Sequence, residues 1–174
     1  MLKLIIILYS LIVVSHALEF TITVTTGHII QGTNSSGVMV RKNKGQQEIV
    51  WQEKFDNDNS LTVYYMQASE ATGLVETIKI DNLCNKYESG SLEHSVKYFI
   101  LNKFGNTNKC SIKKRKVKIS YPLIAEFQGT TENTNCGSTI GTFHIVRNNP
   151  TDSDKTPVLI SAWFRGSISG DSCE

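Results

Sequence analysis

The chain has 174 residues, of which 40% are hydrophobic and 20% are charged, and its formal net charge is +2. This length and apolar content suit a single domain that buries its own core. The near balance of charge gives a weak overall field, which excludes a general nucleic-acid binder and confines electrostatic recognition to local surfaces.

An apolar leader opens the chain. Lys3 precedes an apolar run, and small residues follow at Ser15 and Ala17, in the order that a signal peptidase site requires. The run is short for a bilayer span, and an uncleaved anchor is the alternative. The sequence therefore predicts a signal peptide over residues 1–17 and a secreted, extracellular domain over residues 18–174, without a transmembrane anchor.

Directly after the leader, apolar residues recur with a period of two. Phe20, Ile22 and Val24 alternate with threonines, which gives a strand one apolar face and one hydroxylated face. Clusters of Gly, Asn, Asp, Ser or Pro separate the similar runs that follow: GVMVRK, EIVWQEKF, LTVYYMQ, LVETIKI, VKYFILN, KKRKVKISY, LIAEF, TFHIV and PVLISAWF. Roughly ten short strands predict an all-β fold, an antiparallel β-sandwich, with a barrel as the alternative.

A glycosylation sequon follows the first expected strand. Asn34 begins Asn34-Ser35-Ser36, and the neighbouring glycines and hydroxylated residues indicate an exposed turn. The sequence therefore predicts a glycan on Asn34, with an unused sequon as the alternative.

Two segments resemble the PLAT (lipoxygenase-homology) domains. FTITVTTGHIIQGTNSSGVMV resembles the first hairpin of that family, and ASEATGLVETIKIDN resembles a later Gly-Leu turn and strand that close on Asp81-Asn82. The resemblance ends near Lys103. It implies an eight-stranded β-sandwich that binds lipid surfaces or protein partners, is not itself catalytic, and in some members binds calcium.

The segment FDNDNS provides oxygen ligands for such a calcium ion. Asp56, Asp58 and Asn59 offer hard oxygen atoms on neighbouring loop positions. The segment lacks the glycine and the distal glutamate of a helix-loop-helix site, because Gln67 stands at the glutamate position. Calcium is therefore the candidate cofactor of this loop, and a polar turn between strands is the alternative.

The cysteines indicate a disulfide framework. An even number of cysteines in an exported chain predicts two disulfides, and closure of local loops favours one of the three pairings. That pairing joins Cys84 to Cys110 and Cys136 to Cys173. A zinc site is the alternative, but the cysteines lack metal-knuckle spacing and the histidines are scattered.

A basic run, SIKKRKVKIS, is the candidate binding segment. As a strand it places Lys114, Lys116 and Lys118 on one face and Arg115 on the other. Lysines at every second position lie about 7 Å apart and could meet successive sulfates or lipid phosphates. We expect these four residues to bind an anionic ligand, and lysines that protect a sheet edge are the alternative.

Catalytic motifs are not found in the sequence. RGSISG approaches the Gly-x-Ser-x-Gly motif of α/β-hydrolases, but Ile168 occupies the serine position. His94 and His144 could join a serine in a triad only through the fold, and phosphate loops and dinucleotide fingerprints are absent from the sequence. The sequence therefore predicts a protein that is not an enzyme, with a hydrolase as the alternative.

Three functions from different classes remain open. The first is a secreted module that binds an anionic lipid surface or a lipid-associated protein. The second is a secreted effector or toxin-like protein that binds an extracellular or host protein or a glycosaminoglycan. The third is a hydrolase with an unrecognised site.

Overall fold

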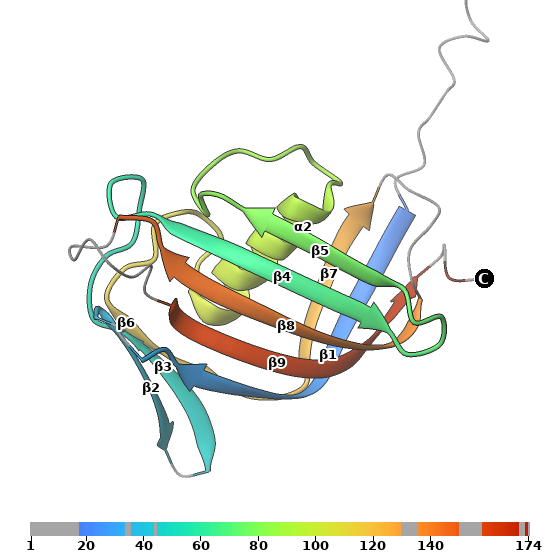
Figure 1. Cartoon of the computed structure of the whole chain (residues 1–174), viewed down its shortest axis with the longest axis horizontal. Coiled ribbons are helices and arrows are strands. Elements are labelled where there is room, and N and C mark those ends of the chain that lie inside the picture. Colours follow the sequence, from blue (N-terminus) through green and yellow to red (C-terminus); the bar gives the residue numbers. More distant parts are fainter. Residues whose placement is uncertain are drawn as a thin grey trace, which may run out of the picture.

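The computed structural model describes residues 18–33, 36–43, 45–129, 136–149, 158–170 and 173. In this part of the chain it contains nine strands, one α-helix and one π-helix (Figure 1). The predicted signal peptide and the sequon at Asn34 lie outside the described residues.

A six-stranded antiparallel sheet, here called the large sheet, forms most of the molecule. Its central strands are long and bury every second side chain over most of their length, as the two-residue period predicts, with consecutive buried residues at one end of each. Its strand order is β5 (Val75–Ile80), β4 (Leu61–Ser69), β8 (Gly137–Arg147), β9 (Val158–Gly170), β1 (Leu18–Gln31) and β7 (Leu123–Gly129).

A second antiparallel sheet of three strands, the small sheet, has the order β2 (Val38–Asn43), β3 (Gln46–Trp51) and β6 (Arg115–Ile119). One of its faces joins the hydrophobic core through Val38, Ile49, Trp51, Val117 and Ile119. In Figure 1 the hairpin of β2 and β3 projects below the large sheet, beside β1. Two antiparallel sheets and disulfides confirm the predicted all-β, disulfide-bonded class.

One predicted strand is wrong. VKYFILN belongs to α2 (Leu92–Phe99), which continues as the π-helix η1 (Ile100–Phe104). The hydroxyl of Ser91 caps the helix by accepting a hydrogen bond from the amide of His94, at 3.1 Å. Buried Val96 and Ile100 lie four residues apart, which is the spacing of one helical face, so burial along a helix replaces the expected alternation.

The helix packs against the core side of the large sheet (Figure 1). Phe104 meets Phe143 of β8 at a centroid distance of 4.9 Å, and it contacts Phe99 at 5.8 Å.

In the described part of the chain, no helix has the length and apolar character needed to cross a membrane.

The predicted cysteine pairing is confirmed. Cys84 and Cys110 form one disulfide and Cys136 and Cys173 form the other, with Cα–Cα distances of 5.1 and 5.4 Å. The first bond encloses α2 and η1, so it ties the helical segment to the end of β5.

Candidate functional site

The exposed lysines of β6 lie on the outer face of the small sheet. Lys116 and Lys118 are exposed while Val117 and Ile119 are buried, and Lys114 is exposed just before the strand. This alternation agrees with the faces predicted from the sequence. β6 is also the end strand of the small sheet, which is where lysines commonly oppose edge-to-edge pairing.

The neighbouring strands add further groups to this surface. Arg41 of β2 and Lys118 of β6 both lie opposite Glu48 of β3, and Arg41 pairs with the buried Glu48 carboxylate at 2.6 Å. Met39 is 39% exposed and shares the next cross-strand row with Lys116. We call this surface, made of Met39, Arg41, Lys114, Lys116 and Lys118, the basic face.

Arg115 lies apart from these lysines. It occupies the opposite face of β6 and is half-buried, and its Nη1 donates a hydrogen bond to the carbonyl of Asn106. Its guanidinium therefore links β6 to the turn after η1. Because Arg115 lies on the opposite face, the structure does not bring it together with the other three predicted ligands.

The candidate calcium loop is organised as a turn. One oxygen of Asp56 accepts hydrogen bonds from the amides of Asp58 and Asn59, at 3.1 and 3.3 Å, and the other pairs with Lys54 at 2.5 Å. The pKa of Asp56 is lowered, mainly by the hydrogen bond from Lys54 and to a smaller extent by those from the backbone amides. The hydrogen bond to Asp56 in turn raises the pKa of Lys54.

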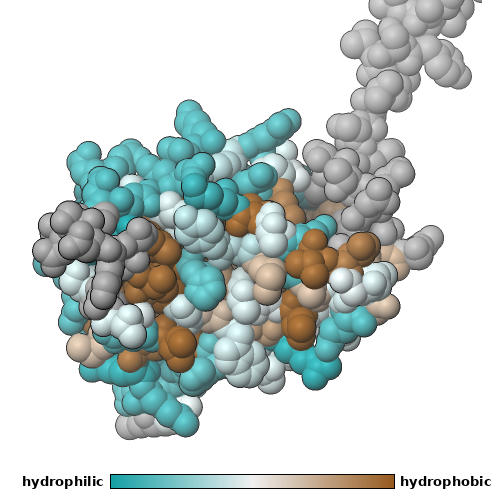
Figure 2. All heavy atoms as spheres, viewed as in Figure 1, coloured by the Kyte–Doolittle hydropathy of each residue, from teal (hydrophilic) through white to brown (hydrophobic). Residues whose placement is uncertain are grey.

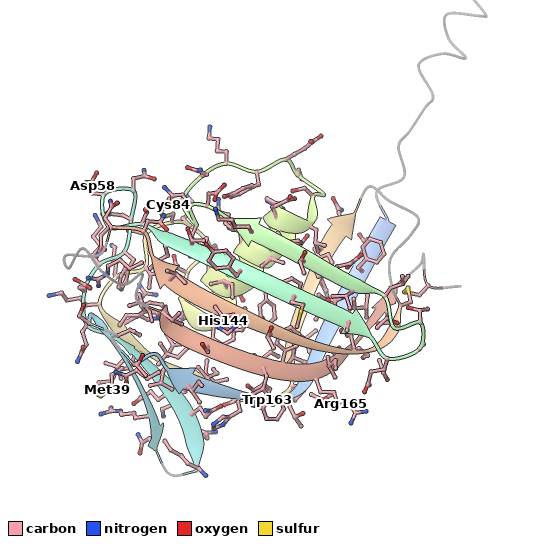
Figure 3. The ribbon with its side chains drawn as sticks, in the orientation of Figure 1. Met39, Asp58, Cys84, His144, Trp163 and Arg165 are labelled. Carbon is pink, nitrogen blue, oxygen red and sulfur yellow. A yellow bond between two sulfur atoms is a disulfide. The ribbon has the colours of Figure 1, made fainter. Side chains whose placement is uncertain are left out.

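These contacts explain the loop without an ion. The side chain of Asn59 donates to the carbonyl of Lys54 at 3.0 Å, and Asp58 is exposed at the molecular edge labelled in Figure 3. Within the described ranges, no group of three His, Cys, Asp or Glu side chains could hold a metal ion. Calcium at Asp56, Asp58 and Asn59 stays a prediction.

A cleft of about 630 Å³ separates β1 from the small sheet. Its walls come from the second half of β1, from the β2–β3 hairpin and from the segment after β6. Its lining residues are Gly27, His28, Ile29, Ile30, Gln31, Val40, Arg41, Lys42, Gly45, Gln46, Gln47, Ile119, Ser120 and Tyr121. This set contains cations, amides and hydroxyls but no carboxylate.

The cleft exists because β7 covers only the first half of β1. The pairing between them stops at Val24 and Leu123, which leaves one side of the later β1 backbone open. Gln47 of β3 fills part of this open side: its Oε1 accepts from the Ile29 amide at 3.1 Å and its Nε2 donates to the Ile29 carbonyl at 2.8 Å. The Gln47 amide thus takes the place of a neighbouring strand's peptide group.

Tyr121 lines the cleft beside Gly27. Its hydroxyl lies so near Gly27 that a Cβ on that residue would approach it to 2.5 Å, which accounts for glycine there. Burial raises the pKa of Tyr121, so its hydroxyl remains protonated at neutral pH and can donate a hydrogen bond.

The outer face of the large sheet carries several exposed aromatic and imidazole groups. Trp163 is 54% exposed, and its ring lies 6.3 Å from that of His28. Tyr64 and Met66 are exposed on β4. Figure 2 shows that this face has mixed hydropathy, with separate apolar patches among polar residues.

His144 and Ser161 meet on this face, at 2.8 Å between Nδ1 and Oγ (Figure 3). In the register of the large sheet, the residues opposite His144 are Tyr64 and Ser161. Among the described residues no carboxylate hydrogen-bonds to the His144 ring, so the pair lacks the third member of a catalytic triad there.

No sequence pattern indicated the cleft, because its walls come from segments that only the topology brings together. The amide pairing of Gln47 with β1 likewise depends on tertiary structure. Comparison of the chain with models of known protein families, with curated proteins and with solved structures finds no match, and the PLAT resemblance stays a prediction.

Proposed function

We propose that the protein is a secreted, non-catalytic binding module whose basic face contacts an anionic lipid surface. The observation that carries the proposal is the outward row of Lys114, Lys116 and Lys118 beside Arg41. Only Glu48 offsets this charge within the two adjoining cross-strand rows, and it is already paired with Arg41.

The geometry suits a flat, negatively charged partner. The lysines project from one side of a short sheet, and each basic residue near an anionic membrane contributes roughly 1 kcal/mol. Met39 is an exposed apolar side chain among these cations, and an apolar group beside basic residues favours the boundary between headgroups and acyl chains.

The competing account is that the lysines only keep the β6 edge soluble. Under that account their removal changes solubility but not lipid binding. The two accounts therefore differ in one measurable quantity, the affinity for anionic vesicles.

The test replaces Lys114, Lys116 and Lys118 together with alanine and measures co-sedimentation with phosphatidylserine vesicles. We expect the triple variant to lose about 3 kcal/mol of binding free energy, which corresponds to roughly 100-fold in affinity, because each of the three lysines contributes roughly 1 kcal/mol. Unchanged binding would leave the lysines with the edge-protecting role alone.

A matched control removes the same charge elsewhere. Lys79, Lys86 and Lys103 lie on β5, in the loop after it and on η1, outside the small sheet. We expect their triple alanine variant to bind vesicles within about twofold of the native protein, because screening confines surface electrostatics to about 10 Å at 0.1 M salt. An equal loss in both variants would indicate a response to net charge alone.

A further inference from the structure

We infer that the cleft between β1 and the small sheet binds an acidic oligosaccharide, one that carries carboxylates or sulfates. The cleft and the basic face share Arg41, whose guanidinium is already paired with Glu48. Lys42 lines the cleft and is not part of the basic face, and Lys114, Lys116 and Lys118 do not line the cleft. The inference therefore does not depend on lipid binding.

Held amides give the cleft its hydrogen-bonding character. The Oε1 of Gln31 accepts from the Val40 amide at 3.1 Å, and the Nε2 of Gln46 donates to the Ser120 hydroxyl at 3.3 Å. Each bond uses one end of the side-chain amide, and the other end has no hydrogen bond to a described residue. A fixed amide with one free end suits the closely spaced hydroxyls of a sugar.

The charge of the cleft selects the kind of sugar. Its lining has no carboxylate, and Lys42 forms no ion pair with any described residue. An ammonium group in a partly enclosed cleft favours a carboxylate or sulfate, while neutral sugars gain nothing from it.

An indole ring lies beside one of the lining residues. His28 lines the cleft, and the ring of Trp163, a residue that is 54% exposed, lies 6.3 Å from the His28 ring. In Figure 3 Trp163 lies on the β1 side of the β2–β3 hairpin and Met39 on the outer side. The negative face of an indole ring packs well against C–H groups such as those of a sugar ring. The volume of about 630 Å³ lies within the usual range of ligand clefts.

An acidic peptide that adds a strand to β1 is the competing ligand. The open backbone invites such pairing, but both peptide groups of Ile29 that face the cleft are already bonded to Gln47. A peptide strand would have to displace this amide, whereas an oligosaccharide can use the amide ends that remain. The contacts therefore favour the sugar.

The experiment titrates the full protein, in a calorimeter, with a heparin tetrasaccharide, a hyaluronan tetrasaccharide, neutral chitotetraose and a tetraglutamate peptide. We expect one of the acidic probes to bind at least tenfold more tightly than chitotetraose. Comparison of sulfated heparin with hyaluronan, which carries carboxylates but no sulfates, shows which anionic group the cleft prefers. Equal binding of the three oligosaccharides, binding of none of them, or tighter binding of the tetraglutamate peptide would overturn the inference.

Variants locate the site. We expect Lys42→Ala and Gln31→Ala each to lower the affinity for the acidic oligosaccharide about tenfold, since each removes a hydrogen-bonding group. Lys118→Ala, which removes a lysine of the same sheet that does not line the cleft, is the matched control and should change binding by less than about twofold. An equal effect of Lys118→Ala, or no effect of Gln31→Ala, would contradict the cleft as the site.

Two further readouts separate folding from binding. Thermal melting of each variant shows that the fold is retained, and phosphatidylserine vesicle binding of Lys42→Ala should equal that of the native protein. Failure of oligosaccharide binding with intact vesicle binding would overturn this inference while leaving the proposed function standing.

Discussion

At the scale of single residues, Arg147 connects three segments at the end of β8. Its guanidinium donates to the carbonyl and hydroxyl of Ser36, at 3.0 and 3.3 Å, and it pairs with Glu53. It also lies over the ring of Phe55, 5.3 Å from the centroid. These contacts join the β1–β2 connection and the segment after β3 to the large sheet.

We expect Arg147→Ala to lower the free energy of unfolding by about 2 kcal/mol, because it leaves polar groups of Ser36 and Glu53 without their partner. Urea denaturation measures the change. The matched control is Arg165→Ala, which removes an Arg–Glu pair whose arginine side chain is 62% exposed, against 9% for Arg147. A surface pair contributes less than about 1 kcal/mol, so equal losses would contradict this account of Arg147.

The ion pair at Asp56 predicts a pH effect. Its pKa is lowered in the folded protein, so the pair stabilises the fold above the unfolded-state pKa and this contribution is lost as pH falls through the folded-state pKa. We expect Lys54→Ala to raise the pKa of Asp56 towards the ordinary aspartate value, as followed by NMR titration of the carboxyl carbon. Lys79→Ala, which breaks a different exposed pair, should leave the Asp56 titration unchanged. An unshifted Asp56 titration in Lys54→Ala would show that backbone amides alone set its pKa.

At the scale of elements, the helical segment depends on its cap and on its disulfide. We expect Ser91→Ala to cost about 1 kcal/mol of stability, because the amide of His94 loses its acceptor. Ser91→Asp should retain stability, since aspartate caps equally well, and Ser89→Ala in the preceding loop is the control. Equal stability of the Ser91→Ala and Ser91→Asp variants would argue against the cap.

The Cys84–Cys110 bond spans 26 positions, and the chain-entropy relation for such a loop gives about 3.5 kcal/mol. We expect the double serine variant at Cys84 and Cys110 to lose about this much in chemical denaturation. An unchanged free energy of unfolding would mean that α2 and η1 are held by packing alone.

The sequence predicted elements where one local pattern governs the structure. The two-residue period located the alternating faces of β6, and local loop closure selected the correct cysteine pairing. The strand prediction for VKYFILN was wrong because its β-branched and aromatic residues suit either element, and the cap at Ser91 was the available helical signal. Arg115 was grouped with the lysines although the two-residue period already placed it on the opposite face, and its contact with Asn106 could not be predicted because it depends on tertiary structure.

At the scale of the whole molecule, the small sheet separates two surfaces of different character. Its outer side is the basic face, and its other side borders the cleft with β1. Lys42 lines the cleft, whereas its neighbour Arg41 contributes to both the cleft and the basic face. The account therefore predicts that variants of Lys114, Lys116 or Lys118 leave oligosaccharide binding intact, and that Lys42→Ala leaves vesicle binding intact.

The measurement that tests the central claim most directly is co-sedimentation of the native, disulfide-bonded protein with phosphatidylserine vesicles and with neutral phosphatidylcholine vesicles, at low and at moderate salt. The account predicts pelleting with the anionic vesicles only, and weaker pelleting as salt screens the basic face. Absence of pelleting with anionic vesicles, or equal pelleting with both kinds, would contradict it.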